Sequence, residues 1–234
     1  MSEQSEKVLG IKQLPIFPLP LVLLPHELLP LHIFEPRYQR MLEDIALEKN
    51  MFGINLFEQK GEFPDRPETG SIGCVAEIRE ANELDDGRSN ILTIGVIRYN
   101  LLEYVQPEEP YLVSELEFFE DEKEDEAVIN PLADEVFGLF KRVAKAAHNL
   151  SNQQGEFPDI PQAPPEQLSF LISAAFNLDN KLKYEMLKMR FTSKRLKRLK
   201  DILKQAVSQV EETAKINKIS RTNGHANKKI DLDL

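Results

Sequence analysis

The feature that most constrains this chain is the apolar stretch LPIFPLPLVLLPHELLPLHIF at residues 14–34. Its length and its 13 large apolar residues match those of a membrane-spanning helix. Its five prolines exclude a helix, because each interior proline costs about 3 kcal/mol. An irregular backbone cannot face lipid, since its amides and carbonyls would lack partners. We therefore expect short extended segments at residues 16–19, 22–24 and 29–34, with a turn at Pro25.

The composition predicts a cytoplasmic protein with a substantial core. At 41% hydrophobic residues, the 234-residue chain can bury a core. The single cysteine, Cys74, excludes an intramolecular disulfide and fits a reducing compartment. The features of a signal peptide, a basic segment before the apolar stretch and a small-residue cleavage site, are not found. We therefore expect no membrane partner.

Charge is unevenly distributed along the chain. The formal net charge of −10 disfavours a nucleic-acid partner, because the affinity of such proteins rests on neutralising phosphates with basic side chains. Residues 103–126 hold 11 acidic side chains and one basic side chain, whereas residues 181–204 hold 10 basic and two acidic ones. We interpret these runs as solvated faces and an acidic linker. The alternative is that the basic run docks an anionic partner, such as the acidic run itself.

The first half of the chain predicts β structure. A helical pattern occurs only at residues 36–49, where Pro36 suits a first turn. Asp86-Gly87 is a hairpin signal. We therefore expect an α+β fold whose first domain, residues 13–119, is mostly antiparallel β with one inserted helix. The strands are expected at residues 51–57, 71–80, 90–104 and 111–119.

The second half predicts helices. Asn130-Pro131 suits the start of a helix, and Asp179 suits the cap of a helix over residues 180–190. Apolar stripes indicate further helices over residues 168–176 and 196–210. We therefore expect a helical bundle over residues 127–212. The polar residues 213–234 are expected to form a disordered tail.

The apolar stretch also carries a family signature. Residues 17–38, FPLPLVLLPHELLPLHIFEPRY, resemble the opening motif of the Lon protease amino-terminal domain, the LON substrate-binding domain. The resemblance covers roughly residues 13–212. Further matching features are Phe52-Gly53, Gly70, Gly73, Asp86-Gly87-Arg88, Gly95, Arg98-Tyr99 and Pro110-Tyr111.

The resemblance implies both a fold and a role. The implied fold is a PUA-like antiparallel β-barrel with one inserted helix, followed by a C-terminal helical bundle. The implied role is a non-catalytic module that binds unfolded or client polypeptide and hands it to a protease or chaperone partner. Full-length Lon proteases add an ATPase and a peptidase. This chain has no G-x-x-x-x-G-K-[ST] phosphate loop, and we expect no room for a peptidase domain after its last helix.

Polar side chains within and beside the stretch do not match a catalytic or metal-binding motif. His26 and His32 follow the spacing H-E-x-x-x-x-H, interrupted by Pro30, instead of the H-E-x-x-H spacing that a helix presents to zinc. Cys74 lies on an expected strand, where a buried, inert thiol is favoured. We therefore predict no catalytic residue, no metal and no cofactor.

Glu35, Arg37 and Arg98 are polar positions next to apolar neighbours. We interpret them as a buried or half-buried ion pair that fixes the corner between a strand and a helix. The alternative is that they are presented to a bound peptide or another partner.

The candidate peptide contacts are Leu21, Leu24, Leu28 and Leu29, in an apolar groove bounded by the prolines. Two other hypotheses remain open. One is RNA or nucleotide binding by a PUA-like barrel with the basic helices at residues 181–200. The other is a scaffold that contacts one folded partner. Binding that falls steeply with salt would favour nucleic acid, and salt-insensitive binding would favour apolar capture.

Overall fold

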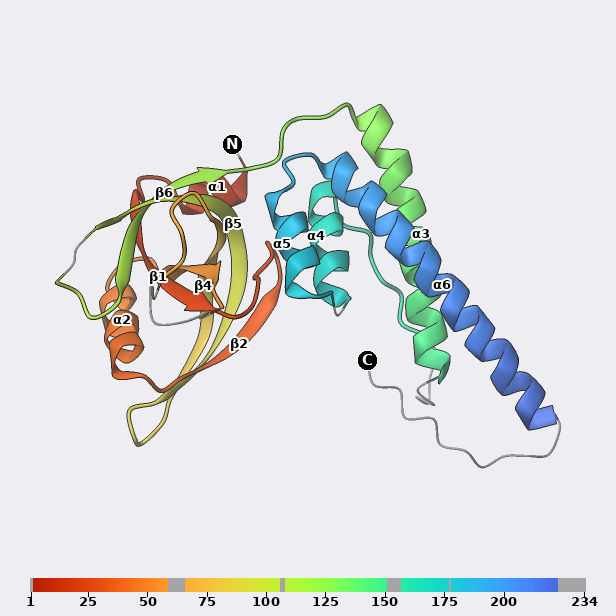
Figure 1. Ribbon diagram of the computed structural model, residues 1–234, viewed down its shortest axis with the longest axis horizontal. Coiled ribbons are helices and arrows are strands. Elements are labelled where there is room, and N and C mark those ends of the chain that lie inside the picture. The colour runs from red at the N-terminus through yellow and green to blue at the C-terminus, as the bar shows by residue number, and fades with distance from the viewer. Residues whose placement is uncertain (1, 59–65, 106–107, 151–156, 177, 223–234) are drawn as a thin grey trace. The chain divides into compact units, whose positions relative to one another are not determined.

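The computed structural model describes residues 2–58, 66–105, 108–150, 157–176 and 178–222. Its elements are shown in Figure 1. Contacts divide the chain into a sheet unit, Met1–Asp121 with Leu178–Arg190, and a helical unit, Glu122–Asn177 with Phe191–Leu234. The elements in chain order are α1 (Glu3–Lys7), β1 (Gln13–Leu19), β2 (Leu28–Ile33), α2 (Pro36–Ala46), β3 (Met51–Leu56), β4 (Ile72–Glu83), β5 (Ser89–Val105), β6 (Leu112–Phe119), α3 (Glu126–Leu150), α4 (Pro165–Ala175), α5 (Asn180–Lys188) and α6 (Thr192–Thr222).

The six strands form one mixed sheet in the order β2-β5-β4-β3-β1-β6, and β5 also pairs with β6. The predicted strands at residues 51–57, 71–80, 90–104 and 111–119 are confirmed as β3 to β6. The expectation of an antiparallel sheet is wrong at one pair, because β1 and β3 run parallel. A parallel pair needs a crossover connection, and β2 with α2 supplies it here.

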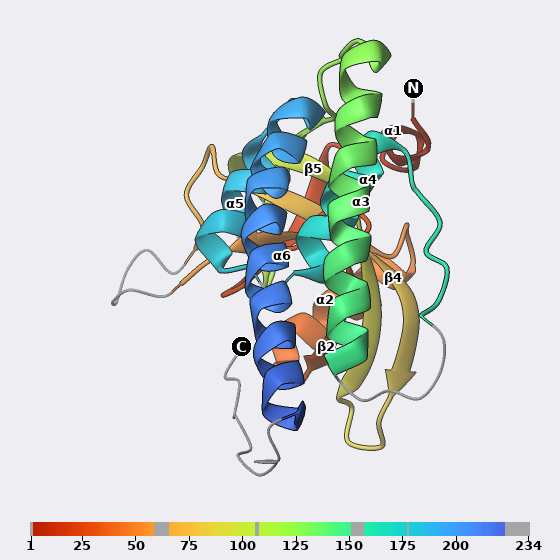
Figure 2. The same ribbon diagram turned by 90° about the vertical axis from the view of Figure 1, so that its right-hand side faces the viewer.

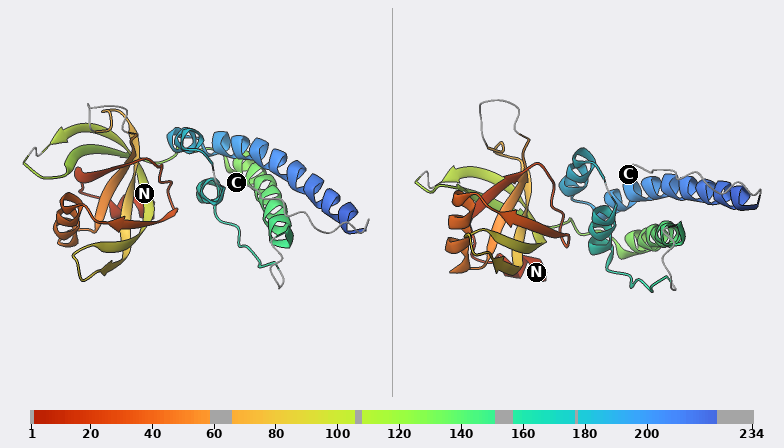
Figure 3. Two further views of the ribbon diagram at one scale, coloured as in Figure 1. Left: turned by 60° about the horizontal axis from the view of Figure 1, so that its bottom comes forward. Right: turned by 90° about the horizontal axis from the view of Figure 1, so that it is seen from below.

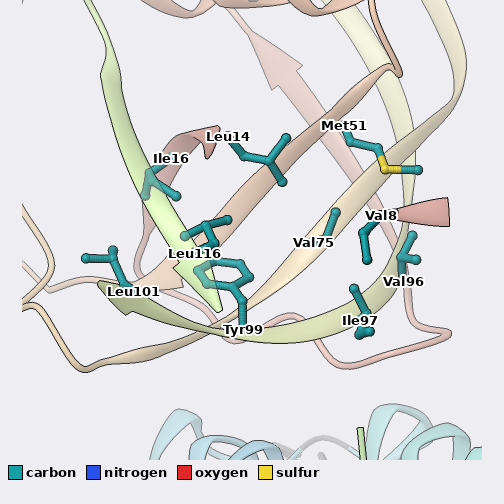
Figure 4. Close-up of a cluster of buried hydrophobic side chains, with 10 residues drawn as sticks. All are labelled: Val8, Leu14, Ile16, Met51, Val75, Val96, Ile97, Tyr99, Leu101 and Leu116. Carbon is teal, nitrogen blue, oxygen red and sulfur yellow. The ribbon is translucent and has the colours of Figure 1, made fainter. Parts of the chain in front are cut away.

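The core of the sheet unit consists of side chains that converge from five of the strands and from the residue after α1 (Figure 4). Tyr99 is fully buried at its centre, and its hydroxyl lies 2.5 Å from Asn55 Oδ1. β2 contributes no member to this cluster. The members are Val8, Leu14, Ile16, Met51, Val75, Val96, Ile97, Tyr99, Leu101 and Leu116.

Helix α2 packs against the sheet, as the two views in Figure 3 show. Pro36 occupies its first turn as predicted, and its buried face includes Tyr38 and Met41. The Tyr38 ring lies 4.0 Å from the ring of Phe17 in β1, measured between centroids. The helix ends at Ala46, three residues before the predicted end.

In the helical unit, α3, α4 and α6 pack against one another. Helices α3 and α6 lie side by side and run in the same direction (Figures 1 and 2). Lys200 of α6 contacts Glu135 of α3 at 2.7 Å. Among the helices in the described ranges, none has the length and apolarity needed to cross a membrane.

Several sequence predictions differ from the helices observed. Helix α3 begins at Glu126 and carries Pro131 inside, because Asp125 already accepts the amide of Ala127 and starts the helix earlier than Asn130. Helix α6 continues to Thr222, ten residues into the expected disordered tail. Residues 223–234 of that tail lie outside the described residues. The predicted cap at Asp179 is confirmed, because its carboxylate accepts the amide of Leu182 at 2.7 Å.

The expected domain boundary also differs from the observed units. We predicted one domain over residues 13–119 and a helical one over residues 127–212. In the structure α5 is grouped with the sheet unit, although it lies between two helices of the helical unit in the sequence.

Candidate functional site

The apolar stretch at residues 14–34 separates into a buried part and an exposed part. Residues 22–24 are at most 3% exposed, although they form no strand. An extended segment was predicted there; it joins no strand, and its side chains fill the core. Leu28, at the start of β2, is 59% exposed.

The buried segment crosses β5 at Gly95. A Cβ atom at position 95 would collide with the carbonyl oxygen of Leu24. The amide of His26 donates to the Gly95 carbonyl at 2.8 Å, and the Gly95 amide donates to the Glu27 carbonyl at 2.9 Å. The predicted turn at Pro25 is confirmed, and His26 in it adopts a φ of 66°. Close approach of the backbone therefore requires glycine at position 95.

The exposed part forms a row along one face of β2. Alternate strand residues point to the same face, and the alternate residues Leu28, Pro30 and His32 are all exposed. Phe34 follows the strand, is 61% exposed, and stacks on His32 with ring centroids 6.1 Å apart. We call Leu28, Pro30, His32 and Phe34 the β2 row.

Strand β5 continues this apolar face. Leu28 pairs with Ile94, and Pro30 pairs with Leu92. Directly paired residues share a face, so the half-buried Ile94 and Leu92 lie beside the β2 row. A shallow pocket of about 390 Å³ opens at this face. We call it the Glu80 pocket, and it is lined by Pro30, Leu31, His32, Glu80, Asn82, Asn90, Ile91 and Leu92.

Strand β2 lies at an edge of the sheet, and within the described residues it pairs only with β5. An open edge can accept a further strand through its free backbone groups. Pro30 lacks an N–H, and a proline is tolerated where its nitrogen faces away from the partner strand. The open edge is therefore interrupted at its centre. The edge of β2 is therefore better suited to contact through its side chains than to pairing with an added strand.

Helix α5 is held against the sheet by Arg98 of β5. The Arg98 guanidinium donates to the carbonyls of Leu187 and Met189 at 3.1 and 2.6 Å, which are at the C-terminal end of α5. It also contacts Asp121 at 2.5 Å, with side chains only 1% and 5% exposed. A cation at the end of a helix compensates its terminal carbonyls. One side chain therefore links α5 to the sheet and to Asp121, two residues after the end of β6.

The N-terminal half of α5 contacts the buried segment. Lys183 forms an ion pair with Glu27 at 2.7 Å, and both side chains are 16% exposed. Asn180 Nδ2 donates to the Pro20 carbonyl at 2.8 Å. These contacts hold both ends of the segment at residues 20–27 and leave the β2 row uninvolved.

An ion pair at the corner between β2 and α2 is observed, but it consists of Glu35 and Arg37 and does not include Arg98. Glu35 and Arg37 pair at 2.9 Å with side chains 40% and 44% exposed, at the start of α2. Arg98 is buried and pairs with Asp121. The sequence did not indicate Asp121, because it lies in an acidic run that was interpreted as a solvated linker.

The predicted peptide contacts have different environments. Leu24 is fully buried and packs in the core, whereas Leu28 is exposed. Leu21 and Leu29 are half-buried. Whether any of them binds peptide stays a prediction. Phe34 was not among the predicted contacts, although its alternation with Leu28, Pro30 and His32 was a signal that could have identified it.

The titratable groups near the buried segment favour uncharged forms. Burial raises the pKa of the Cys74 thiol well above its ordinary value, so this thiol is protonated at neutral pH. Burial also lowers the pKa of His26, and the nearby Glu3 opposes that effect. Among the described residues, no group of three or more His, Cys, Asp or Glu is placed to hold a metal ion.

The two units differ in charge. The sheet unit contains 25 acidic and 14 basic residues, a formal charge of −11, and the helical unit contains 14 acidic and 15 basic residues, a charge of +1. The basic run at residues 181–200 is split between the units. Lys183 in it is paired with Glu27, and Arg195 is fully buried with its guanidinium 4.0 Å from the Phe170 ring centroid. The run is therefore not one continuous basic surface.

Comparisons with known proteins agree on one family. The family model described as the ATP-dependent protease La (LON) substrate-binding domain matches residues 13–205. The Lon protease of Brevibacillus choshinensis is 28% identical over 206 residues, which cover 87% of this chain and 26% of that protein. The Lon protease of Heliobacterium modesticaldum is 24% identical over 220 residues, which cover 93% of this chain and 27% of that protein. The chain thus spans about a quarter of the length of these relatives.

Solved structures show the same fold. A Lon N-terminal domain protein from Xanthomonas campestris has a TM-score of 0.60 at 20% identity, covering 81% of this chain and 97% of that one. The N-terminal domain of the Mycobacterium avium complex Lon protease has a TM-score of 0.57 at 16% identity, covering 82% and 98%.

Proposed function

Because the chain belongs to the family of the ATP-dependent protease La (LON) substrate-binding domain, we propose that it binds unfolded or client polypeptide segments through the β2 row. The observation that carries the proposal is the exposure of two apolar side chains, Leu28 at the start of β2 (59%) and Phe34 directly after it (61%). The half-buried Leu92 and Ile94 of β5 lie beside the β2 row. An apolar face of this kind gains free energy when an apolar side chain covers it.

The mode of binding follows from the strand that carries the row. Pro30 interrupts the open edge of β2, so a client is held by its side chains and not by a continuous backbone ladder. A client lying along β2 in an extended conformation matches the spacing of Leu28, Pro30 and His32, because alternate residues of a strand are about 7 Å apart. The β2 row therefore favours segments with alternating apolar residues.

The proposal includes two further features of the family resemblance. The module acts without catalysis of its own, and it hands its client to a protease or chaperone in trans.

The proposal also includes the fold that the resemblance implies. The sheet closes as a PUA-like barrel, which the pairing of β5 with both β4 and β6 supports. The mutual packing of α3, α4 and α6 supports a helical bundle.

The test is binding of the purified chain to a fluorescently labelled unfolded polypeptide, measured at low and high salt. We expect saturable binding that persists at high salt, since apolar contacts are not screened. The double variant Leu28→Ser, Phe34→Ser should weaken binding at least tenfold while the protein stays folded. The matched control is Leu47→Ser, which removes an exposed leucine (88%) at the end of α2, away from β2.

Two outcomes would contradict the proposal. Equal losses in the double variant and in Leu47→Ser would mean that binding is not located at the β2 row. Binding of a single-stranded RNA alone, abolished by salt, would indicate a nucleic-acid module.

A further inference from the structure

The Glu80 pocket has a charge that the β2 row lacks. Glu80 is the one residue of its lining with a formal charge at neutral pH, and it is exposed on β4. Among the described residues no ion pair involves Glu80. The neighbouring Glu77, by contrast, forms ion pairs with Lys7 at 2.8 Å and with Arg79 at 3.0 Å. Glu80 is therefore a carboxylate available to a ligand beside an apolar face.

The position of Glu80 selects a long side chain. Glu80 pairs with Leu92, and Leu92 pairs with Pro30, so the three residues lie side by side across adjacent strands. Adjacent strands are about 4.8 Å apart, which places Glu80 about 10 Å across the sheet from the β2 row. A side chain that leaves a client at the row crosses Pro30 and Leu92 before it meets the carboxylate.

Lysine and arginine fit this path. Their aliphatic stems cover apolar surface while the charged end stays hydrated or paired. Pro30 and Leu92 supply the apolar surface, and Glu80 supplies the counter-charge. Asn82 offers a further amide oxygen at the rim, whereas Asn90 Oδ1 is already 2.7 Å from His32 Nδ1.

The net charge of the whole sheet unit also favours a cationic ligand. Its formal charge of −11 creates a field that attracts cationic segments before contact. We therefore propose that the Glu80 pocket takes a lysine or arginine side chain of the client, so that apolar segments carrying a basic residue are preferred. This inference rests on the proposed function, because the client must first lie along the β2 row.

The experiment compares three labelled peptides that share one apolar, extended sequence and differ at one central position, which is lysine, glutamine or glutamate. We expect the lysine peptide to bind about two- to fivefold more tightly than the glutamine peptide, the range for one exposed ion pair. The glutamate peptide should bind most weakly. Glu80→Gln should remove the preference for lysine. Glu103→Gln, which removes an exposed carboxylate of β5 outside the pocket, should retain it.

The outcomes separate the two proposals. If the three peptides bind equally, or if Glu80→Gln and Glu103→Gln change the preference by the same factor, the basic-client inference is overturned and the β2 row stands. If no peptide binds, both proposals fail. If the lysine preference is lost only in Glu80→Gln while Leu28→Ser weakens all three peptides, both are supported.

Discussion

Residues 22–24 and residues 28–34 come from one proline-rich stretch and have nearly the same apolar composition, but their environments are opposite. The first segment is irregular and buried, and its Leu24 has no exposed surface. The second contains strand β2, with Leu28 at its start and Phe34 directly after its end, and both side chains are exposed. Hydrophobicity alone therefore does not place a residue in the core here. Gly95 lets the backbone of the first segment approach β5 closely, because a Cβ at position 95 would collide with the Leu24 carbonyl.

The charged residues show the same contrast. Glu35 and Arg37 form an exposed pair, and Arg98 and Asp121 form a buried pair that also holds the end of α5. Exposed pairs contribute little because water screens them, whereas a buried charge that loses its partner is costly. Comparing matched substitutions in the buried and exposed members tests this distinction.

The largest expected effect is at Arg98. Arg98→Leu should lower the free energy of unfolding by about 3–5 kcal/mol, because Asp121 and two helix-end carbonyls lose this guanidinium. Arg37→Leu should cost about 1 kcal/mol or less. Urea unfolding followed by circular dichroism measures both. Similar losses in the two variants would show that the buried pair is not a structural anchor.

Next in size is the contrast between two leucines four residues apart. Leu24→Ala should cost about 2–5 kcal/mol through lost burial and a cavity. Leu28→Ala should change stability by about 0.5 kcal/mol or less, as exposed positions do. Thermal and urea unfolding of both variants provide the measurement. An equal cost would mean that Leu28 is buried in solution and cannot face a client.

A smaller effect on stability is expected at Gly95, where the buried segment crosses β5. Gly95→Ala should destabilise by about 1–3 kcal/mol, because the added methyl group meets the Leu24 carbonyl and forces the segment to shift. Gly138→Ala is the matched control, since a Cβ there meets nothing within 4 Å and removing a helix glycine should stabilise by about 0.5–1 kcal/mol. If Gly95→Ala left the free energy of unfolding unchanged, the buried segment could shift at Gly95 without losing stability.

The smallest effect concerns His26, at the turn between the two segments. Its φ of 66° favours glycine, so His26→Gly should add about 1 kcal/mol or less to stability. Burial lowers the His26 pKa in the folded state, so protonation favours the unfolded state and stability is lost as pH falls below the ordinary value of 6.5. The advantage of His26→Gly should therefore be larger at pH 5 than at pH 8. An advantage independent of pH would contradict the pKa shift.

Sequence patterns predicted much of the fold and only part of the site. The strands β3 to β6, the first-turn Pro36 of α2 and the cap Asp179 of α5 follow local signals, and these were predictable. The burial of residues 22–24 depends on the distant Gly95, which a local pattern does not contain. The partner of Arg98 was missed because Asp121 lies in a run of similar acidic residues, and only the end of β6 selects it. Contacts made across long sequence separations account for these errors.

The place of α5 has a consequence for how the chain folds as it is synthesised. The sheet unit is complete only when Leu178–Arg190 joins it, and 69 residues, 122 to 190, must be added after its first 121. At ribosomal rates of roughly 5–20 residues per second, this takes about 3–14 s. Until then Arg98 has no Leu187 or Met189 carbonyl to bind. During synthesis the sheet unit is therefore formed for some seconds without the contacts that α5 makes with Arg98.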